Sequence, residues 1–318
     1  MIEKKTEVTI LVSSCDKYED AWEPFFRLLN IQWPDCPYNI VLSTETKKYN
    51  CDFLNVETIN SSPQLSWSSR LKNVLTQIST EYVLFFLEDF FLLETVKTDI
   101  FELALKLMKS DEKIGLITFN KRSLEAVFPE TPDYEHCFLE LTSKNLARTN
   151  VLVGLWRKDY YLKLIIDGED PWQYEKNSNI RSKYAGSKIY TQNYEVSFPA
   201  FRYCMNPKDG YGITGGKWLR SNREFFESKG IYGINYNNLG TVEEIVTYES
   251  IQAANRKQLQ VRKQQQKEFL KKLKWQYRLK EYLYEYRKKI KKSFWGQKLT
   301  YRLTSIKYFI YYKFTINL

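Results

Sequence analysis

Residues 82–87 (YVLFFL) constrain the fold more than any other segment, because all six side chains are apolar or aromatic and none alternates with a charged one. A strand of this composition is buried on both faces, as in the middle of a mainly parallel sheet that has helices on each side. Residues 66–78, directly before it, repeat apolar side chains at helical spacing, with Ser66 as a candidate N-cap. A helix that leads into a buried strand is one unit of an α/β fold.

The rest of the first half continues this alternation of strands and helices. Compact apolar runs predict further strands at residues 7–13, 38–43, 55–59, 114–119, 138–142 and 151–156. Helical spacing predicts further helices at residues 22–29 and 99–109. Between residues 176 and 240 the periodicity fades, and glycines mark a loop in the sequence DGYGITGGKW. We therefore predict an α/β fold over residues 1–245, with a Rossmann-type, mainly parallel sheet flanked by helices.

Charge is divided unevenly along the 318 residues. Residues 256–318 contain 19 Lys or Arg and three Glu, a net charge of +16, whereas residues 1–255 contain 29 Lys or Arg and 35 Asp or Glu, a net charge of −6. Residues 241–294 lack Gly and Pro, which favours a long helix or a helix pair. We therefore predict a basic C-terminal helical extension at residues 246–318, separate from the acidic body.

The basic extension has three candidate partners. Residues 269–295 place apolar and aromatic side chains on one broad helical arc among basic residues, as in helices that lie on anionic membranes. We favour an anionic membrane surface as the partner of residues 256–318, ahead of packing against the body or another subunit. Nucleic acid comes third, because no RRM, KH, OB or zinc-finger signature accompanies the charge.

Several common classes of site lack their sequence signatures. Five scattered cysteines without a C-x-x-C pair disfavour a zinc site or a disulfide framework and fit a reducing cytoplasm. His136 is the only histidine, and no G-x-S-x-G, Walker A or G-x-G-x-x-G sequence is present. The N-terminal apolar run is short, and no segment reaches the roughly 18 apolar residues of a spanning helix. We therefore expect a cytoplasmic protein without a leader, in peripheral contact with a membrane.

An acidic pair, Glu88 and Asp89, follows the buried strand. In open α/β sheets ligands bind outside the carboxyl ends of the strands, so this pair lies where a site is expected. Carboxylates there can chelate Mg²⁺ or Mn²⁺ together with the phosphates of a nucleotide. The alternative is that the two acids only end the strand and face solvent.

Residues 66–93, SWSSRLKNVLTQISTEYVLFFLEDFFLL, resemble the helix, strand and metal-site region of bacterial GT-A glycosyltransferases that assemble cell-surface polysaccharide such as capsule and O-antigen. The resemblance implies a GT-A-like fold, a divalent cation held by Asp89, and contact of Glu88 with the nucleotide ribose or the metal shell. In this chain the third acidic position of the D-x-D triplet is Phe90.

Residues 155–182, LWRKDYYLKLIIDGEDPWQYEKNSNIRS, resemble the acceptor region of the same glycosyltransferases. Here the resemblance implies that Glu175 is the base that deprotonates the acceptor hydroxyl. Arg181 matches an Arg that often follows the base some residues later in these enzymes. Glu169 and Asp170 form a competing alignment for the base. An alcohol is a weak nucleophile at neutral pH, so a positioned carboxylate must take its proton. Trp172 could stack on a sugar face, although core packing is the commoner role of a single Trp.

Further donor contacts are expected around the first strand and the glycine loop. By resemblance, the loop that begins at Ser13 cradles the nucleotide base, with Asp16 as a partner for a uracil N–H or, alternatively, as a helix N-cap. Arg70, on the helix expected at residues 66–78, could reach phosphate. Lys217 follows the glycines, and a mobile loop that contains it could close over the donor. A UDP-sugar is the favoured donor, with Mn²⁺ or Mg²⁺ as the cation.

The sequence therefore predicts a glycosyltransferase that moves a sugar from a nucleotide-diphosphate sugar to an acceptor hydroxyl, with inversion. We expect it at the inner leaflet of the plasma membrane, acting on a lipid-linked oligosaccharide or another glycan. A nucleotidyltransferase is the rival enzyme, but VSSCDKYED after the first strand lacks the glycine-rich basic loop that such an enzyme needs. The rival non-enzyme is an RNA-binding or partner-binding protein that acts through the basic extension.

Overall fold

A computed structural model describes residues 7–119, 135–143, 145, 147–204 and 212–242. All of them belong to Met1–Tyr248, the first of two units into which the chain divides. The expected basic extension at residues 246–318 lies outside the described residues, as does nearly all of the helical segment expected at residues 241–294. The extension, its partners and the boundary at residue 245 therefore stay predictions.

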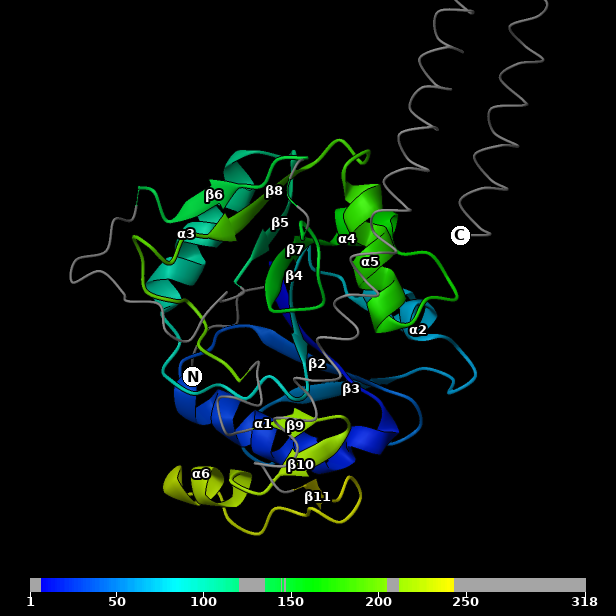
Figure 1. The fold of residues 1–318 in the computed structure, drawn as a ribbon, viewed down its shortest axis with the longest axis vertical. Helices are drawn as coiled ribbons and strands as arrows, with labels where there is room; N and C mark the ends of the chain where they lie inside the picture. The colour runs from blue at the N-terminus through cyan, green and yellow to red at the C-terminus, as the bar shows by residue number, and fades with distance from the viewer. Residues whose placement is uncertain (1–6, 120–134, 144, 146, 205–211, 243–318) are drawn as a thin grey trace, which may run out of the picture. The chain divides into compact units, whose positions relative to one another are not determined.

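An eight-stranded sheet with the order β3-β2-β1-β4-β7-β5-β8-β6 forms the centre of the described fold (Figure 1). Its strands are β1 (Val8–Ser13), β2 (Asn39–Thr44), β3 (Val56–Asn60), β4 (Tyr82–Leu87), β5 (Ile114–Thr118), β6 (Phe138–Glu140), β7 (Gly154–Arg157) and β8 (Lys188–Gln192). Most pairs are parallel, whereas β7 runs antiparallel between β4 and β5, and β6 runs antiparallel beside β8. The predicted α/β fold class, with a mainly parallel sheet, is confirmed.

Helices cover both faces of this sheet (Figure 1). They are α1 (Glu19–Gln32), α2 (Trp67–Gln77), α3 (Thr98–Ser110), α4 (Lys158–Leu164) and α5 (Pro171–Ser182). Helices α1 and α3 bury side chains such as Phe25 and Phe101 in one core, and α2, α4 and α5 bury Leu71, Tyr161 and Tyr174 in the other. Burial from two sides explains why β4 is apolar along its whole length.

The elements of the first half lie close to their predicted bounds. Ser66 caps α2 as expected, because its Oγ accepts a hydrogen bond from the N–H of Ser69 at 3.2 Å. Helix α1 is longer than the predicted 22–29, since it begins at the polar residue Glu19 and continues through Pro24. Most of its buried side chains lie inside the predicted segment, whereas Asp20, Ala21 and Gln32 are buried outside it, so the apolar spacing located the centre of the packed face and not its ends.

The segment 176–240, where the sequence periodicity fades and for which we predicted no helix or strand, contains several elements. Helix α5 continues to Ser182, and β8 joins the main sheet. A second, three-stranded sheet has the order β11-β10-β9 and consists of β9 (Ile213–Thr214), β10 (Lys217–Leu219) and β11 (Thr241–Val242), with helix α6 (Asn222–Ser228) beside it. Trp218 of β10 stacks on Phe91 at 5.6 Å between ring centroids, so this small sheet packs against the segment that follows β4.

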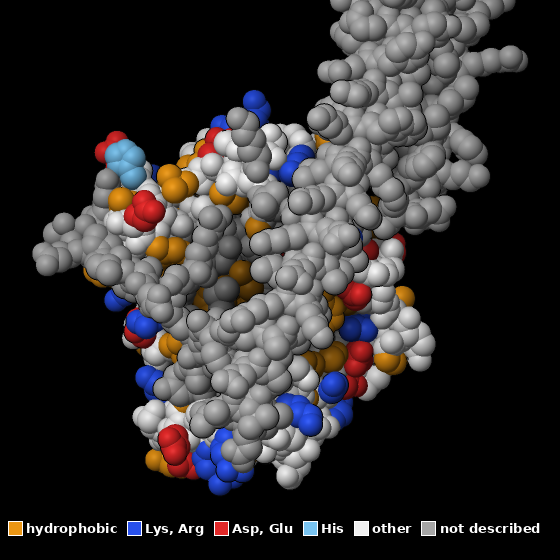
Figure 2. All heavy atoms as spheres, viewed as in Figure 1, with side chains coloured by type: hydrophobic (Ala, Val, Ile, Leu, Met, Phe, Trp, Pro, Cys, Tyr) orange, Lys and Arg blue, Asp and Glu red, His pale blue; other side chains and the backbone are white. Residues whose placement is uncertain are grey.

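Within the described residues no helix has the length and hydrophobicity needed to cross a membrane. Over the described part of the face in Figure 2, Lys and Arg side chains lie among Asp and Glu side chains. This mixture fits the near-balanced charge of residues 1–255.

Candidate active site

Glu88 and Asp89 form a turn at the carboxyl end of β4, which lies between β1 and β7 in the sheet. The turn is closed by the N–H of Phe90, which donates to the carbonyl of Leu87 at 3.2 Å. Glu88 is 7% exposed, and the Oδ1 atom of Asp89 is buried. The alternative that the pair only faces solvent is therefore wrong for Glu88 and for one oxygen of Asp89.

Glu88 and Asp89 bring two carboxyl groups close together, and burial affects the pKa of both. Burial raises the pKa of Glu88 well above its ordinary value, and the charge of Asp89 raises it further, while a hydrogen bond from Ser14 acts in the opposite direction. Burial also raises the pKa of Asp89. Asp89 Oδ1 has no hydrogen-bond partner among the described residues. Two adjacent buried carboxylates with an unpaired oxygen can accept a proton or a cation.

Phe90, at the third position of the acidic triplet, points into the core. It is 7% exposed, and its ring lies 5.0 Å from the ring of Tyr203 between centroids. Since this side chain packs against the apolar core, an acidic residue at position 90 would be buried there without joining the pair. The pair is therefore a doublet of Glu88 and Asp89.

The loop after β1 lies next to the acidic pair. Ser13 ends β1, is buried, and is level with Leu87 in the register of β1 and β4. The next residue, Ser14, accepts a hydrogen bond from Trp22 Nε1 at 2.7 Å and hydrogen bonds to Glu88. Ser14 thus connects the start of α1 to the acidic pair and fixes the position of Glu88.

Tyr18 also lies beside the acidic pair. It ends the short 3-10 helix η1 (Asp16–Tyr18). Burial raises its pKa to about 12, with the charges of Glu88 and Asp89 as the next causes. A phenol in this position stays protonated and can donate a hydrogen bond to an anion bound at the pair.

Asp16 has a different environment from the one expected. Its Oδ1 accepts hydrogen bonds from the backbone N–H groups of Glu45, Thr46 and Lys47 at 3.1, 3.0 and 3.2 Å, and the Thr46 hydroxyl donates to Oδ2. Desolvation alone would raise its pKa, but these hydrogen bonds lower it. Cys15, not Asp16, holds the N-cap position of η1. The Asp16 carboxylate holds the loop after β2 against the loop after β1, and its predicted contact with uracil stays untested.

Arg70 is already paired inside the protein. Its Nη1 lies 3.0 Å from Glu45 Oε1 and donates to the carbonyl of Leu65 at 2.9 Å. The other Glu45 oxygen accepts the N–H of Asp16 at 3.2 Å. Arg70, Glu45 and Asp16 therefore connect α2, β2 and β1 at their ends that border the acidic pair. A phosphate would have to compete with Glu45 for Arg70.

Lys217 lies on the hairpin of β9 and β10, and its side chain is exposed. The hairpin turns at Gly215 and Gly216, whose φ angles of 58° and 75° belong to the left-handed region that favours glycine. A Cβ at position 216 would lie 3.6 Å from Tyr18 Oη, so the turn approaches the phenol that borders the acidic pair. Lys217 is therefore near the same edge of the sheet, and its predicted closure over a donor stays a prediction.

Glu175 comes to the same edge through the segment before β7. Its Oε1 accepts a hydrogen bond from the N–H of Val151 at 3.4 Å. Gly154, at the start of β7, pairs with Phe85 of β4. Because the two strands are antiparallel, the segment before β7 lies at the carboxyl end of β4. The fold therefore brings the predicted base and the predicted donor-binding pair to one edge of the sheet.

The competing alignment for the base gives residues with structural contacts. Glu169 is buried and accepts two hydrogen bonds from Arg181, each at 2.7 Å, and one from Asn177 at 2.8 Å. Asp170 is the N-cap of α5 and forms a capping box with Gln173. Both carboxylates are therefore bound within the protein, and the choice of Glu175 as the base stays a prediction.

The two tryptophans of this region have opposite environments. Trp156 is 1% exposed and stacks on Tyr161 at 4.0 Å between ring centroids, so it packs in the core. Trp172 is 70% exposed. The preference for a core role is therefore wrong for Trp172.

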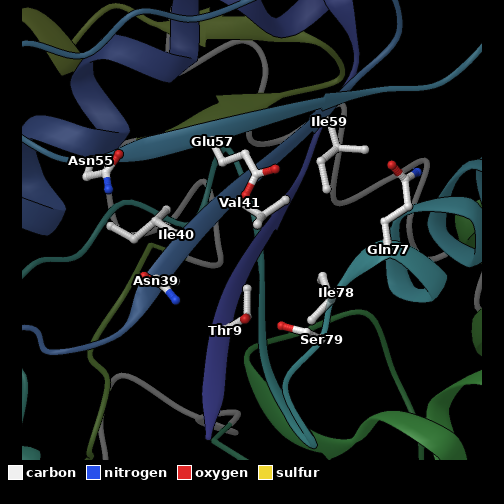
Figure 3. Close-up of a pocket in the computed structure, with 10 residues that line it drawn as sticks. All are labelled: Thr9, Asn39, Ile40, Val41, Asn55, Glu57, Ile59, Gln77, Ile78 and Ser79. Carbon is white, nitrogen blue, oxygen red and sulfur yellow. The ribbon is translucent and has the colours of Figure 1, made fainter. Parts of the chain in front are cut away.

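One cavity lies away from this edge. It has a volume of about 490 Å³ and is lined by residues from the amino-terminal halves of β1 and β2, from β3 and from the end of α2 (Figure 3). They include Thr9, Asn39 and Glu57 on the strands, Gln77 at the end of the helix and Ser79 after it. Ligand sites of α/β sheets lie at the carboxyl ends of strands, so we assign the active site to the acidic pair and not to this cavity.

A preformed cluster of three or more His, Cys, Asp or Glu ligands is absent from the part of the chain that the structure describes. The acidic pair supplies two carboxylates, which is the number of protein ligands that Mg²⁺ often uses when phosphates complete its shell. The unpaired Asp89 Oδ1 is therefore more consistent with a cation whose shell is completed by phosphates than with a cation held by protein ligands alone.

Comparison with known proteins gives matches of structure only. No family model and no curated protein matches the sequence. S. aureus TarS 1-349 in complex with UDP has 13% identity, with 64% of this chain and 62% of that chain covered and a TM-score of 0.44. A protein from Desulfovibrio desulfuricans G20 described as a nucleotide-diphospho-sugar transferase has 9% identity, 59% and 80% coverage and a TM-score of 0.36. A cytidylyltransferase from Leptospira borgpetersenii has 11% identity, 54% and 68% coverage and a TM-score of 0.33.

These likenesses bear on neither reaction nor substrate, because identity and TM-score are both low. The chain also spans less than two thirds of the TarS chains, 37% of one and 62% of another. Function is therefore argued from the site itself.

Sequence reasoning missed two residues of this site, Tyr18 and Glu45. Glu45 follows β2 as Glu88 follows β4, so the rule that located the acidic pair could also have located it. Ser14 belongs to the loop that the resemblance assigned to the nucleotide base, but its hydrogen bond to Glu88 was not predicted. No sequence pattern indicated Tyr18, because its position beside the acidic pair depends on the 3-10 turn and on a hairpin about 200 residues later in the chain.

Proposed function

We propose that this protein transfers a sugar from a nucleotide-diphosphate sugar to an acceptor hydroxyl. The observation that carries the proposal is the pair Glu88 and Asp89 at the carboxyl end of the central strand, where Glu88 and Asp89 Oδ1 are buried and Oδ1 has no hydrogen-bond partner among the described residues. Such a pair suits an anionic ligand that binds together with a divalent cation. A nucleoside diphosphate with Mg²⁺ or Mn²⁺ is a ligand of this kind.

On the donor side, Asp89 would hold the cation and Glu88 would contact the ribose or the metal shell. When bound, the cation neutralises charge on the departing diphosphate. The loops that begin at Ser13 and after β2 would surround the base, with their relative position fixed by Asp16. Arg70, released from Glu45, and Lys217 would supply positive charge to the phosphates. A UDP-sugar is our preferred donor.

On the acceptor side, Glu175 would take the proton of the acceptor hydroxyl while that oxygen attacks the anomeric carbon. The antiparallel pairing of β7 with β4 supports this role, because the segment before β7, which donates to Glu175, lies at the carboxyl end of β4 where the donor would lie. A single base opposite the leaving nucleotide is sufficient for direct displacement, so we propose inversion at the anomeric carbon.

A test of this assignment compares the wild type with Glu175→Gln. Loss of the general base should lower the transfer rate about 10²- to 10⁴-fold, while UDP binding, followed by the rise in melting temperature, stays the same. Asp170→Asn is the matched control, because it keeps a capping side chain at the start of α5. Full transfer activity of Glu175→Gln would remove this residue from the mechanism.

The same assay separates the proposal from a nucleotidyltransferase. A glycosyltransferase releases UDP from a UDP-sugar, whereas a nucleotidyltransferase releases pyrophosphate from a nucleoside triphosphate and a sugar phosphate. The loop after β1 supports the former, since Ser13, Ser14 and Cys15 offer no glycine or basic residue for a triphosphate. Release of pyrophosphate without release of UDP would favour the rival enzyme.

We further propose that the protein works in cell-surface polysaccharide assembly at the inner leaflet of the plasma membrane, on a lipid-linked or free glycan acceptor. The charge of +16 in residues 256–318 supports contact with anionic lipid. Flotation of the full chain with phosphatidylglycerol vesicles, but not with phosphatidylcholine vesicles, is the expected result, and it should weaken as salt is added.

A further inference from the structure

Trp172 is a large aromatic side chain on the surface beside the proposed acceptor site. It is 70% exposed, whereas Trp22, Trp156 and Trp218 are at most 1% exposed. Exposure of an indole contributes nothing to folding, because its apolar area stays in water. An exposed Trp on a helix next to a site is therefore a candidate for contact with a ligand.

The backbone that carries Trp172 is held firmly. Asp170 closes a capping box at the start of α5, and Pro171 occupies the first turn. The N–H of Glu169 donates to Ser68 Oγ at 3.0 Å, and its carboxylate is held by Arg181. These contacts fix the first turn of α5 on α2, so the indole is presented from a rigid support.

Trp172 and Glu175 lie on neighbouring positions of the same helix surface. Residues three apart on a helix have Cβ atoms about 5–6 Å from each other. Tyr174 and Ser178 are buried and mark the face of α5 that packs on the core, Trp172 points away from that face, and Glu175 lies between the two. A ligand stacked on Trp172 would therefore extend directly to Glu175.

We propose that Trp172 is the platform for a pyranose ring of a glycan acceptor. This inference rests on the proposed function, because Glu175 is the base only if a sugar is transferred. The C–H face of a pyranose packs on an indole, and the side chains next to Trp172, Gln173 and Lys176, are exposed and polar, as sugar hydroxyls require. A lipid surface would instead need further apolar side chains around the indole.

Glycan binding to the full chain tests this proposal. Chitotetraose, cellotetraose and mannotetraose are each titrated into the wild type, Trp172→Ala and Trp172→Phe, with binding followed by saturation-transfer NMR and calorimetry. Tyr232→Ala is the matched control, because Tyr232 is another exposed aromatic at 72% and lies after α6. Melting curves verify that all variants fold.

We expect at least one of the three glycans to bind the wild type, with a loss of affinity of at least tenfold in Trp172→Ala, a smaller loss in Trp172→Phe and none in Tyr232→Ala. UDP binding should be equal in all four proteins. The proposal is overturned if none of the glycans binds, if Trp172→Ala binds them as well as the wild type, or if Trp172→Ala loses binding to phosphatidylglycerol vesicles while it keeps the glycans. Absence of UDP binding by the wild type would instead count against the proposed function, so the two failures are distinguishable.

Discussion

At the scale of single residues, the acidic pair works against the stability of the fold. Glu88 and Asp89 are adjacent, and burial raises the pKa of each. A charged carboxylate without a partner is unfavourable in such a place, and a protein keeps one there chiefly where a ligand needs it. Removal of one of these carboxylates should therefore increase the stability of the fold and weaken ligand binding.

Asp89→Asn should show the gain in stability as a function of pH. The pKa of Asp89 is raised from its ordinary 3.8 to about 6, so its protonated form is favoured in the folded state. The stability that this proton gives is fully present below pH 3.8 and is lost as the pH rises through 6. In the presence of EDTA, the variant should melt several degrees above the wild type at pH 8 and close to it at pH 4.

Melting curves from pH 4 to pH 8 measure this difference. Asp170→Asn, on the surface of α5, is the control that should show no such trend. A melting-temperature difference that stays constant across the pH range would contradict a buried, destabilising carboxylate at position 89.

Part of the site was predictable at this scale, and part was not. The position of Glu88 and Asp89 follows from one rule, that a buried strand of a parallel sheet delivers its next residues to the ligand edge. Asp16 and Arg70 were placed near that edge, but their pairing with the loop after β2 depends on Glu45 and Thr46, which are distant in sequence. The exposure of Trp172 depends on which face of α5 packs, and the weak periodicity of that helix gave no indication of it.

At the scale of elements, apolar patterning was sufficient for the first half of the chain and insufficient for the second. Strands β1, β2, β4 and β5 and helices α2 and α3 are close to their predicted bounds, because each buries a dense apolar face. Strand β8 (KIYTQ) was missed, since its Lys188 pairs with Asp111 and its Gln192 donates to Phe198 and accepts from Ala200. Polar side chains satisfied by distant partners leave no periodic signal in the sequence.

The contact between α2 and the start of α5 is predicted to be important for stability. Glu169→Gln removes one charge of a buried pair with Arg181, and it should lower the free energy of unfolding by about 3 kcal/mol. Lys72→Gln breaks an exposed pair between α2 and Asp167, and it should cost at most about 1 kcal/mol. Urea denaturation measures both.

Equal effects of these two substitutions would contradict the view that the buried pair, and not the surface pair, holds α5 on α2. A large loss of transfer activity in Glu169→Gln without loss of stability would point instead to Glu169 as the base.

The packing of β5 against α4 leaves no room for a side chain at Gly115. A Cβ there would lie 2.2 Å from Tyr160 Cδ1, and Tyr160 is itself buried. Gly115→Ala should therefore destabilise the protein by about 1–3 kcal/mol, as overpacked cores do. Gly154→Ala on the neighbouring β7 is the matched control, because its Cβ would meet the end of Leu116 at 3.1 Å and would otherwise have no contact shorter than 3.4 Å. A larger loss of stability in Gly154→Ala, measured by urea denaturation, would contradict this packing.

At the scale of the whole molecule, the order of the strands explains why residues far apart in sequence form one site. The end of β4 carries the acidic pair, the adjacent β1 delivers Ser14 and Tyr18, and β7 on the other side delivers Val151 with Glu175. A donor at β1 and β4 and an acceptor near β7 and α5 would then meet over the acidic pair. Sequence alone predicted the sheet but not that β7 runs antiparallel beside β4.

The proposed function requires that a nucleoside diphosphate binds over Glu88 and Asp89, which a crystal structure of the protein with UDP and Mn²⁺ would show. We expect an anomalous Mn²⁺ peak at the Asp89 carboxylate, the diphosphate beside it, and the uracil between the loops after β1 and β2. Density for UDP in the cavity lined by Thr9, Asn39 and Glu57, with the acidic pair empty at millimolar nucleotide, would contradict it.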